Sequence, residues 1–173
     1  MKKLFTIVFG FLCAISSLTA DTVVSENKPF SLTYNGNDWP FMRHELKNSG
    51  EFFDFFTNDF NEPFGIASIV AKDRTGETLQ DCADNILELK DFPGSHISIL
   101  KQEMRTINNI DMLFLDIKIQ RDSLAVKGNC YIYLAKDYYV EISTYALEEY
   151  YKDFEIKLAQ FINGFCVEAE EEV

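Results

Sequence analysis

Histidines, serines and carboxylates are the residue types from which a catalytic site would be built in this chain of 173 residues. The two histidines are far apart in sequence, with His44 in a predicted strand and His96 in a predicted turn. No Gly-x-Ser-x-Gly nucleophile motif accompanies them, so we interpret both as surface histidines rather than as catalytic bases. Serines and aspartates are numerous, and a catalytic triad assembled in space stays open as an alternative.

The 28 acidic residues form many carboxylate pairs, including Glu148-Glu149, Asp111 with Asp116, and Asp54 with Asp59. At this density no pair stands out as the two facing carboxylates that a glycoside hydrolase needs. The sequence has no glycine-rich phosphate loop, no His-Glu-x-x-His motif and no calcium-binding loop. We therefore predict no catalytic residues, no metal site and no cofactor.

The segment best suited to ligand binding is the aromatic stretch over residues 39–64. Trp39 and Phe41 are followed by six phenylalanines, at positions 52, 53, 55, 56, 60 and 64. Burial under helices on both faces of a sheet is the first interpretation, because six phenylalanines in water would form a large apolar patch. The alternative is a groove for a partner or a small apolar ligand, with Asp54 at its rim. The candidate binding residues are Trp39, Phe53, Asp54 and Phe56.

Alternating hydrophobic residues predict an antiparallel sheet around these candidates. Over 112–120, the residues Leu113, Leu115, Ile117 and Ile119 face one way and polar residues face the other, which is typical of a strand with one buried face. Segments 30–34, 97–106, 130–134 and 138–144 are also predicted strands. Asn108-Asn109 tolerates the positive φ of a tight hairpin turn, so the later strands are expected to form a meander.

Two segments have helical periodicity. The first includes Leu79, Ala83, Ile86 and Lys90, and begins after Thr78, with Asp81 three positions on as a capping partner. The second covers 147–165, where apolar and aromatic residues recur every three or four positions over five turns. It is expected to bury Phe154, Leu158 and Phe161 against the sheet and to end near Gly164.

The first twenty residues have the pattern of a secretory signal peptide: a basic start, an apolar run and a small-residue end at Ala20. We predict cleavage after Ala20 and a periplasmic or secreted protein, with an uncleaved anchor as the alternative. Cleavage leaves 14 basic and 28 acidic residues, a net charge of −14. Such a charge argues against nucleic acid and membrane surfaces. Solubility of an exported protein is the first explanation of the charge, and a protein partner with a basic surface is the alternative.

Three cysteines remain after cleavage: Cys82, Cys130 and Cys166. Their odd number and wide spacing suit neither a disulfide scaffold nor a zinc site. We expect buried, unpaired thiols, with one disulfide and one free thiol as the alternative.

The order of elements from residue 30 to 165 resembles the PsbP/DcrB-like superfamily. The resemblance lies in a strand leading into the turn and tryptophan of 34–39, the Thr78-capped helix, the hairpin turn at 106–109, and a final helix ending at 161–165. It implies an α/β/α sandwich with a mainly antiparallel sheet. It also implies accessory, binding or chaperone-like functions, and it supplies no catalytic motif.

The predicted organisation is a signal peptide over 1–20, a flexible segment over 21–29, one domain over 30–167 and an acidic tail over 168–173. The first functional hypothesis is an exported, non-enzymatic module that binds a protein partner. Carriage of a small apolar ligand in an aromatic-lined pocket is the second, and a hydrolase is a poor third.

Overall fold

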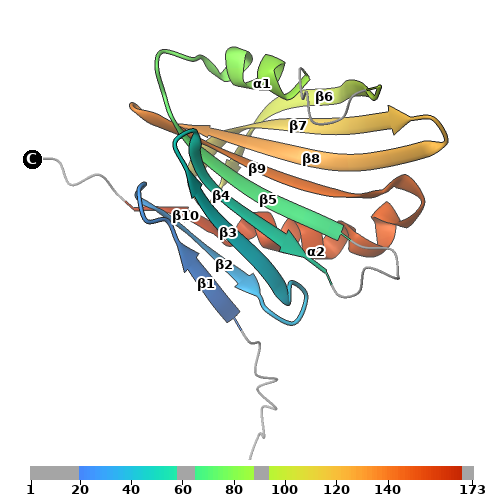
Figure 1. Cartoon of the computed structure of the whole chain (residues 1–173), viewed down its shortest axis with the longest axis horizontal. Helices are drawn as coiled ribbons and strands as arrows, with labels where there is room; N and C mark the ends of the chain where they lie inside the picture. Colours follow the sequence, from blue (N-terminus) through green and yellow to red (C-terminus); the bar gives the residue numbers. More distant parts are fainter. Residues whose placement is uncertain (1–19, 58–64, 88–93, 169–173) are drawn as a thin grey trace, which may run out of the picture.

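The computed structural model describes residues 20–57, 65–87 and 94–168, and Figure 1 shows their arrangement as a strongly curved sheet with elements on both faces. The main sheet has seven strands, each antiparallel to its neighbours. In spatial order they are β3 (Phe41–Lys47), β4 (Gly50–Phe56), β5 (Gly65–Asp73), β9 (Tyr138–Leu147), β8 (Leu124–Leu134), β7 (Ile110–Arg121) and β6 (His96–Ile107).

The predicted meander is confirmed in β6 to β9. Asn108 and Asn109 connect β6 to β7 with φ of 50° and 64°, values that few residues other than glycine and asparagine adopt easily. The predicted inward face of β7 is also confirmed, because Leu113, Leu115 and Ile117 are buried together. The prediction of a single buried face is wrong for the start of the strand, since Met112 and Phe114 are buried on the opposite face.

The face that carries these three residues is covered by helix α1 (Leu79–Leu87), and we call it the α1 face of the main sheet. The predicted capping box begins the helix. The Thr78 backbone N–H donates to Asp81 Oδ2 over 2.7 Å, and the Asp81 backbone N–H donates back to Thr78 Oγ1 over 3.2 Å. Helix α1 buries Cys82, Ala83 and Ile86, and Lys90 lies outside the described residues.

The opposite face, here the α2 face, is covered by helix α2 (Tyr151–Asn163) and by a small sheet of β1 (Ala20–Val24), β2 (Phe30–Asn35) and β10 (Phe165–Val167). A short 3₁₀ helix, η1 (Glu148–Tyr150), connects β9 to α2. Phe55, Leu158 and Phe161 are each at most 1% exposed between these layers. Elements on both faces of an antiparallel sheet give the predicted α/β/α sandwich.

The prediction that residues 21–29 are flexible is wrong for the first part of this segment. Residues 20–24 form β1, which pairs antiparallel with β2 from Ala20 opposite Asn35 to Val24 opposite Ser31. The strand is held because Val23 is only 7% exposed and joins the core. The predicted signal peptide up to residue 19 and the acidic tail from residue 169 lie outside the described residues.

The final helix is shorter than its apolar periodicity predicts. Leu147 belongs to β9 and Phe165 to β10, while Phe154 is half-buried rather than buried. The predicted stop at Gly164 is confirmed, since this residue is the C-cap of α2. A Cβ atom at Gly164 would lie 1.7 Å from the carbonyl oxygen of Thr33, so only glycine lets the chain turn this close to β2.

The expectation of three buried, unpaired cysteines is confirmed for two of them. Cys82 and Cys130 are buried free thiols between α1 and the main sheet, but Cys166 is exposed. The reason is strand alternation in β10, where the buried side chain is Phe165. Among the described residues, no helix is both long and apolar enough to cross a membrane.

Candidate functional site

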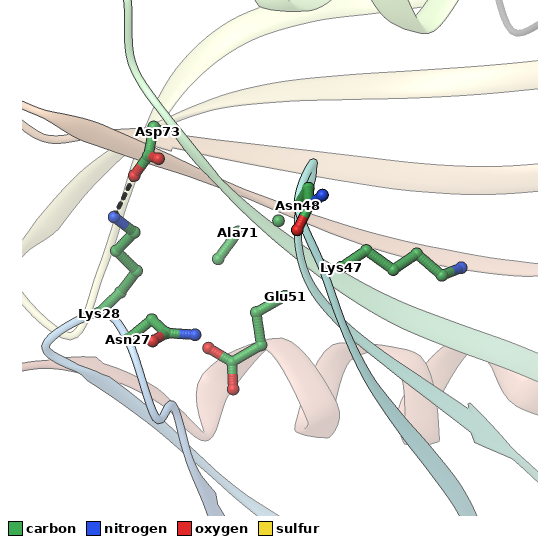
Figure 2. A pocket seen from close by; sticks show the side chains of 8 residues that line it. Asn27, Lys28, Lys47, Asn48, Glu51, Ala71 and Asp73 are labelled. Carbon is green, nitrogen blue, oxygen red and sulfur yellow. Dashed lines mark hydrogen bonds and ion pairs between the residues drawn. The ribbon is translucent and has the colours of Figure 1, made fainter.

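A polar cavity of about 250 Å³ opens where three chain segments meet: the turn after β1, the β3–β4 turn and the end of β5 (Figure 2). Its walls carry acids, amides and two lysines. The lining residues are Asn27, Lys28, Lys47, Asn48, Gly50, Glu51, Ala71 and Asp73.

Glu51 is the carboxylate at the inner wall of this cavity, and its side chain is only 1% exposed. The Ser25 hydroxyl donates to Glu51 Oε2 over 2.5 Å. The Glu26 backbone N–H and His44 Nε2 both approach Glu51 Oε1, at 3.1 and 3.0 Å. Three hydrogen bonds therefore satisfy a buried charge that would otherwise be costly to remove from water.

Local backbone geometry places Glu51 on the inside. Strand β4 alternates, and Glu51 shares the α2 face with Phe53 and Phe55. Gly50 precedes it with φ of +143°, and a Cβ atom there would lie 2.4 Å from the Ala71 carbonyl oxygen. The glycine thus allows β4 to begin close against β5, which brings Glu51 beneath the turn after β1.

The charges around the cavity leave an excess of acid. Lys28 forms an ion pair with Asp73, drawn as the dashed line in Figure 2, so these two charges neutralise each other. Lys47 extends away from Glu51 in the same view; its Nζ lies 2.6 Å from Glu45 and over the ring of Phe52. Glu51 is therefore the charge that faces the cavity without a lysine partner of its own in the described part of the chain.

This arrangement contains serine, histidine and a carboxylate, but it does not have the connectivity of a serine–histidine–carboxylate triad. In a catalytic triad the serine hydroxyl donates to the histidine, which removes its proton. Here the Ser25 proton is directed to Glu51, and the His44 ring stacks on Phe53 with centroids 4.4 Å apart. The described residues also hold no cluster of three or more His, Cys, Asp or Glu side chains suited to a metal ion.

A second cavity, of about 240 Å³, lies between the small sheet and α2 and is lined partly by aromatic rings. Trp39 is one of these rings; it is 2% exposed and packs on Phe161 with ring centroids 5.0 Å apart. Lys157 of α2 pairs with Asp38 at 2.9 Å and so ties the turn before Trp39 to the helix. The lining residues are Ala20, Thr33, Tyr34, Asn35, Asp38, Trp39, Lys157, Gln160 and Phe161.

The four candidate residues do not converge on one groove. Trp39 lines the second cavity, whereas Phe53 is buried in the core of the α2 face. Asp54 and Phe56 lie on the other face of β4, both half-buried, and the Asp54 carboxylate accepts from Arg43 over 2.5 Å. The expected burial of the phenylalanines is thus complete for Phe53 but partial for Phe56.

Glu51 and its partner Ser25 are not among the predicted site residues, and the interpretation of His44 as a surface histidine is only partly right. His44 is half-buried and bonded to Glu51 rather than a free surface residue, because β3 pairs it with Phe53 beside the small sheet. His96 is exposed, as predicted. One signal was available: Glu51 occupies an inward position in the alternation that places Phe53 and Phe55 inside.

The two buried thiols beneath α1 are poorly suited to nucleophilic chemistry. Burial raises the pKa of Cys82 to about 11, and nearby Glu141 adds to the shift. Burial raises the pKa of Cys130 further. Since the thiolate is the reactive form, both residues act as small apolar side chains at neutral pH.

The fold of this chain is found among solved structures at low sequence identity. No protein-family model matches the chain, and no curated protein matches it. Cyanobacterial PsbP (CyanoP) from Synechocystis sp. PCC 6803 superposes with a TM-score of 0.65 at 11% identity, over 92% of this chain and 99% of that one.

Two other solved structures are similar. PA94, a protein of unknown function from Pseudomonas aeruginosa, has a TM-score of 0.59 at 10% identity, over 87% of this chain and 99% of that one. LpqN, involved in cell envelope biogenesis of Mycobacterium tuberculosis, has a TM-score of 0.56 at 11% identity, over 87% and 92%. The chain therefore has the PsbP/DcrB-like fold that the sequence resemblance predicts.

Proposed function

We propose that this chain is an exported accessory module that binds a protein partner and performs no catalysis itself. The observation that carries the proposal is the set of hydrogen bonds around Glu51. They hold a carboxylate at the wall of a surface cavity and use the Ser25 proton to do so. In this proposal the Ser25 hydroxyl serves to position the Glu51 carboxylate, and His44 is not its hydrogen-bond acceptor as it would be in a catalytic triad.

The partner's chemistry follows from the charge of the cavity. Glu51 gives it an acid that pairs with no lysine or arginine in the described part of the chain, and the amide oxygens of Asn27 and Asn48 add further acceptors at its rim. A lysine or arginine side chain from the partner would donate to these oxygens in addition to the three hydrogen bonds that Glu51 already makes. The whole chain carries a net charge of −12, so long-range attraction would steer a basic surface toward it.

The fold supports an accessory role in general terms. Structures with this fold include PsbP, and LpqN is described as involved in cell envelope biogenesis. A shared fold does not establish a shared function, so the proposal depends on the cavity and not on the likeness.

The direct test uses a minimal probe of stated chemistry. An acetylated Ala-Lys-Ala amide should shift the backbone amide NMR signals of Asn27, Asn48 and Gly50 in a saturable way, and the same peptide with norleucine for lysine should not. Glu51→Gln keeps the size of the side chain and removes its charge, so it should abolish the lysine-dependent shifts. Asp54→Asn is the matched control, since Asp54 is on the opposite face of the same strand.

Binding of the protein partner itself should depend on salt. Capture from the exported fraction should decrease as the Debye length falls from about 10 Å to about 3 Å, and Glu51→Gln should reduce it. Equal shifts with both peptides, or capture by Glu51→Gln at the level of the unmodified protein, would contradict this site.

The second cavity favours one alternative function, carriage of a small apolar ligand against Trp39. Its volume of about 240 Å³ is below the usual range of about 300–1,000 Å³ for small-molecule pockets. Organic extraction of the purified protein followed by mass spectrometry tests this alternative. A stoichiometric apolar ligand whose retention does not weaken with salt would support carriage and overturn the first proposal.

A further inference from the structure

Strand β3 is an edge of the main sheet with large apolar side chains in solvent. In the described part of the chain it pairs only with β4. Phe41, Met42 and Leu46 are 50%, 44% and 49% exposed. Exposed edge strands with apolar side chains tend to pair with another strand.

The other edge of the same sheet, β6, is less regular than β3, although its Leu100 and Met104 are each 55% exposed. Strand β6 has a register irregularity between Ile99 and Lys101, and such bulges discourage pairing by a further strand. The pairing of β3 with β4 is continuous over all seven of its residues. Strand β3 therefore presents a regular row of backbone groups.

The hairpin geometry indicates which backbone groups face outward. A two-residue turn, Asn48-Ser49, joins β3 to β4, and Lys47 lies opposite Gly50. The residues that flank such a turn exchange hydrogen bonds with each other, and inward and outward groups then alternate along the strand. The outward N–H and C=O groups are accordingly those of Met42, His44 and Leu46.

We propose that β3 binds β3 of a second copy of this chain in an antiparallel arrangement with its two-fold axis at His44. This register matches outward groups with outward groups and uses the whole strand. On the α2 face it places Met42 opposite Leu46 of the second copy. On the α1 face it places Arg43 opposite Glu45 of the second copy and Phe41 opposite Lys47 of the second copy.

Charge selects this register over its neighbours. An axis at Arg43 would place two arginines opposite each other, and an axis at Glu45 would place two glutamates opposite each other. The axis at His44 instead gives two opposite-charge pairs, two apolar pairs and two Lys–Phe pairs. The side chains of β3 also carry two cationic charges and one anionic charge. Two copies with a net charge of −12 each repel one another overall, but the two β3 strands do not add negative charge at the contact.

The register is tested by disulfide trapping in a Cys166→Ser background, which removes the exposed thiol. Met42→Cys with Leu46→Cys should give a covalent dimer under mild oxidation, because facing Cα atoms in an antiparallel pair are about 5.5 Å apart, within disulfide range. Leu100→Cys on β6, at a residue 55% exposed, is the matched control and should give far less dimer.

Sedimentation of the full mature protein tests the charges. Arg43→Glu and Glu45→Arg alone should each raise the dimer dissociation constant about tenfold, because two like-charge pairs replace two opposite-charge pairs, and the double variant should recover the unmodified value. Leu46→Lys should weaken the dimer, while Leu100→Lys should not. A protein that is monomeric at all concentrations, or a dimer insensitive to Leu46→Lys, would overturn the proposal without affecting the peptide test at Glu51.

Discussion

Glu51 shows how one buried carboxylate can organise a surface that three segments share. It joins the turn after β1, through Ser25 and the Glu26 backbone, to His44 on β3. The contacts of Ser25 and Glu26 connect the turn of the small sheet to the main sheet, and the contact of His44 connects two neighbouring strands of the main sheet. A polar residue in this position fixes how the two sheets meet at the mouth of the cavity.

Replacement of Glu51 by alanine should lower the free energy of unfolding by about 1–3 kcal/mol, because the buried donors that it satisfies lose their acceptor. Urea unfolding followed by far-UV circular dichroism measures the loss. Asp54→Ala should cost less, since Asp54 pairs with Arg43 near solvent. Equal losses for the two variants would show that the hydrogen bonds of Glu51 add nothing beyond an exposed ion pair.

The capping residue Asp81 should make the stability of the folded protein decrease at acidic pH. Hydrogen bonds from the Thr78 side chain and backbone lower the pKa of Asp81 below its ordinary value of 3.8. The folded state therefore binds this proton less readily than the unfolded state, so the stabilisation is complete above the unfolded-state pKa and is lost as the pH falls through the folded-state pKa. The difference in unfolding midpoint between the unmodified protein and Asp81→Asn should be largest near neutral pH. It should shrink below about pH 4, near the ordinary aspartate pKa, and a difference independent of pH would contradict the cap.

At the scale of elements, α2 holds the sandwich together because it contacts both sheets. Phe161 is 1% exposed and packs against rings from three other segments: Tyr34, Trp39 and Phe55. One side chain of the helix thus links β2, the turn before β3 and β4. Such a position leaves little room for neighbours to relax into a cavity.

Phe161→Ala should therefore lower the free energy of unfolding by about 3–5 kcal/mol, as core aromatic truncations do. The same change at Ile156, which is 71% exposed on the same helix, should cost less than about 0.5 kcal/mol. Chemical denaturation of both variants makes the comparison. A small loss at Phe161 would mean that α2 is held mainly by other contacts.

At the scale of the whole molecule, the predicted cleavage site after Ala20 lies at the first residue of β1, where the folded domain begins in the described part of the chain. Asp21, the new first residue, pairs with Tyr34 inside the small sheet. Removal of the leader would therefore preserve the strand except for its first residue. The mature chain would then be a complete sandwich, with both proposed binding surfaces formed by residues after position 20.

Intact-mass measurement of the exported protein should give the mass of a chain that begins at Asp21. The physical reason is that the uncharged run before this point is short for a bilayer span and ends in small residues. Recovery of a species that retains Met1 from the membrane fraction would mean that the segment is an anchor.

The sequence by itself determined the parts of this protein that depend on near neighbours along the chain. Alternation predicted β7 with its buried face, Asn108-Asn109 predicted the hairpin turn, and Thr78 with Asp81 predicted the start of α1. These features arise from backbone sterics, turn geometry and local hydrogen bonds, whose range is a few residues. The order of such elements was also sufficient to suggest the fold.

Only the tertiary structure decided where these elements meet. Ser25 and Glu51 are 26 positions apart, and no local pattern signals that a turn after β1 will close over the start of β4. Strand β1 likewise forms because β2 offers it a partner, and Phe53 and Asp54 separate because β4 has two faces with different neighbours. Sheet pairing and side-chain burial depend on contacts distant in sequence, so the binding surfaces that they create become visible only when the chain is folded.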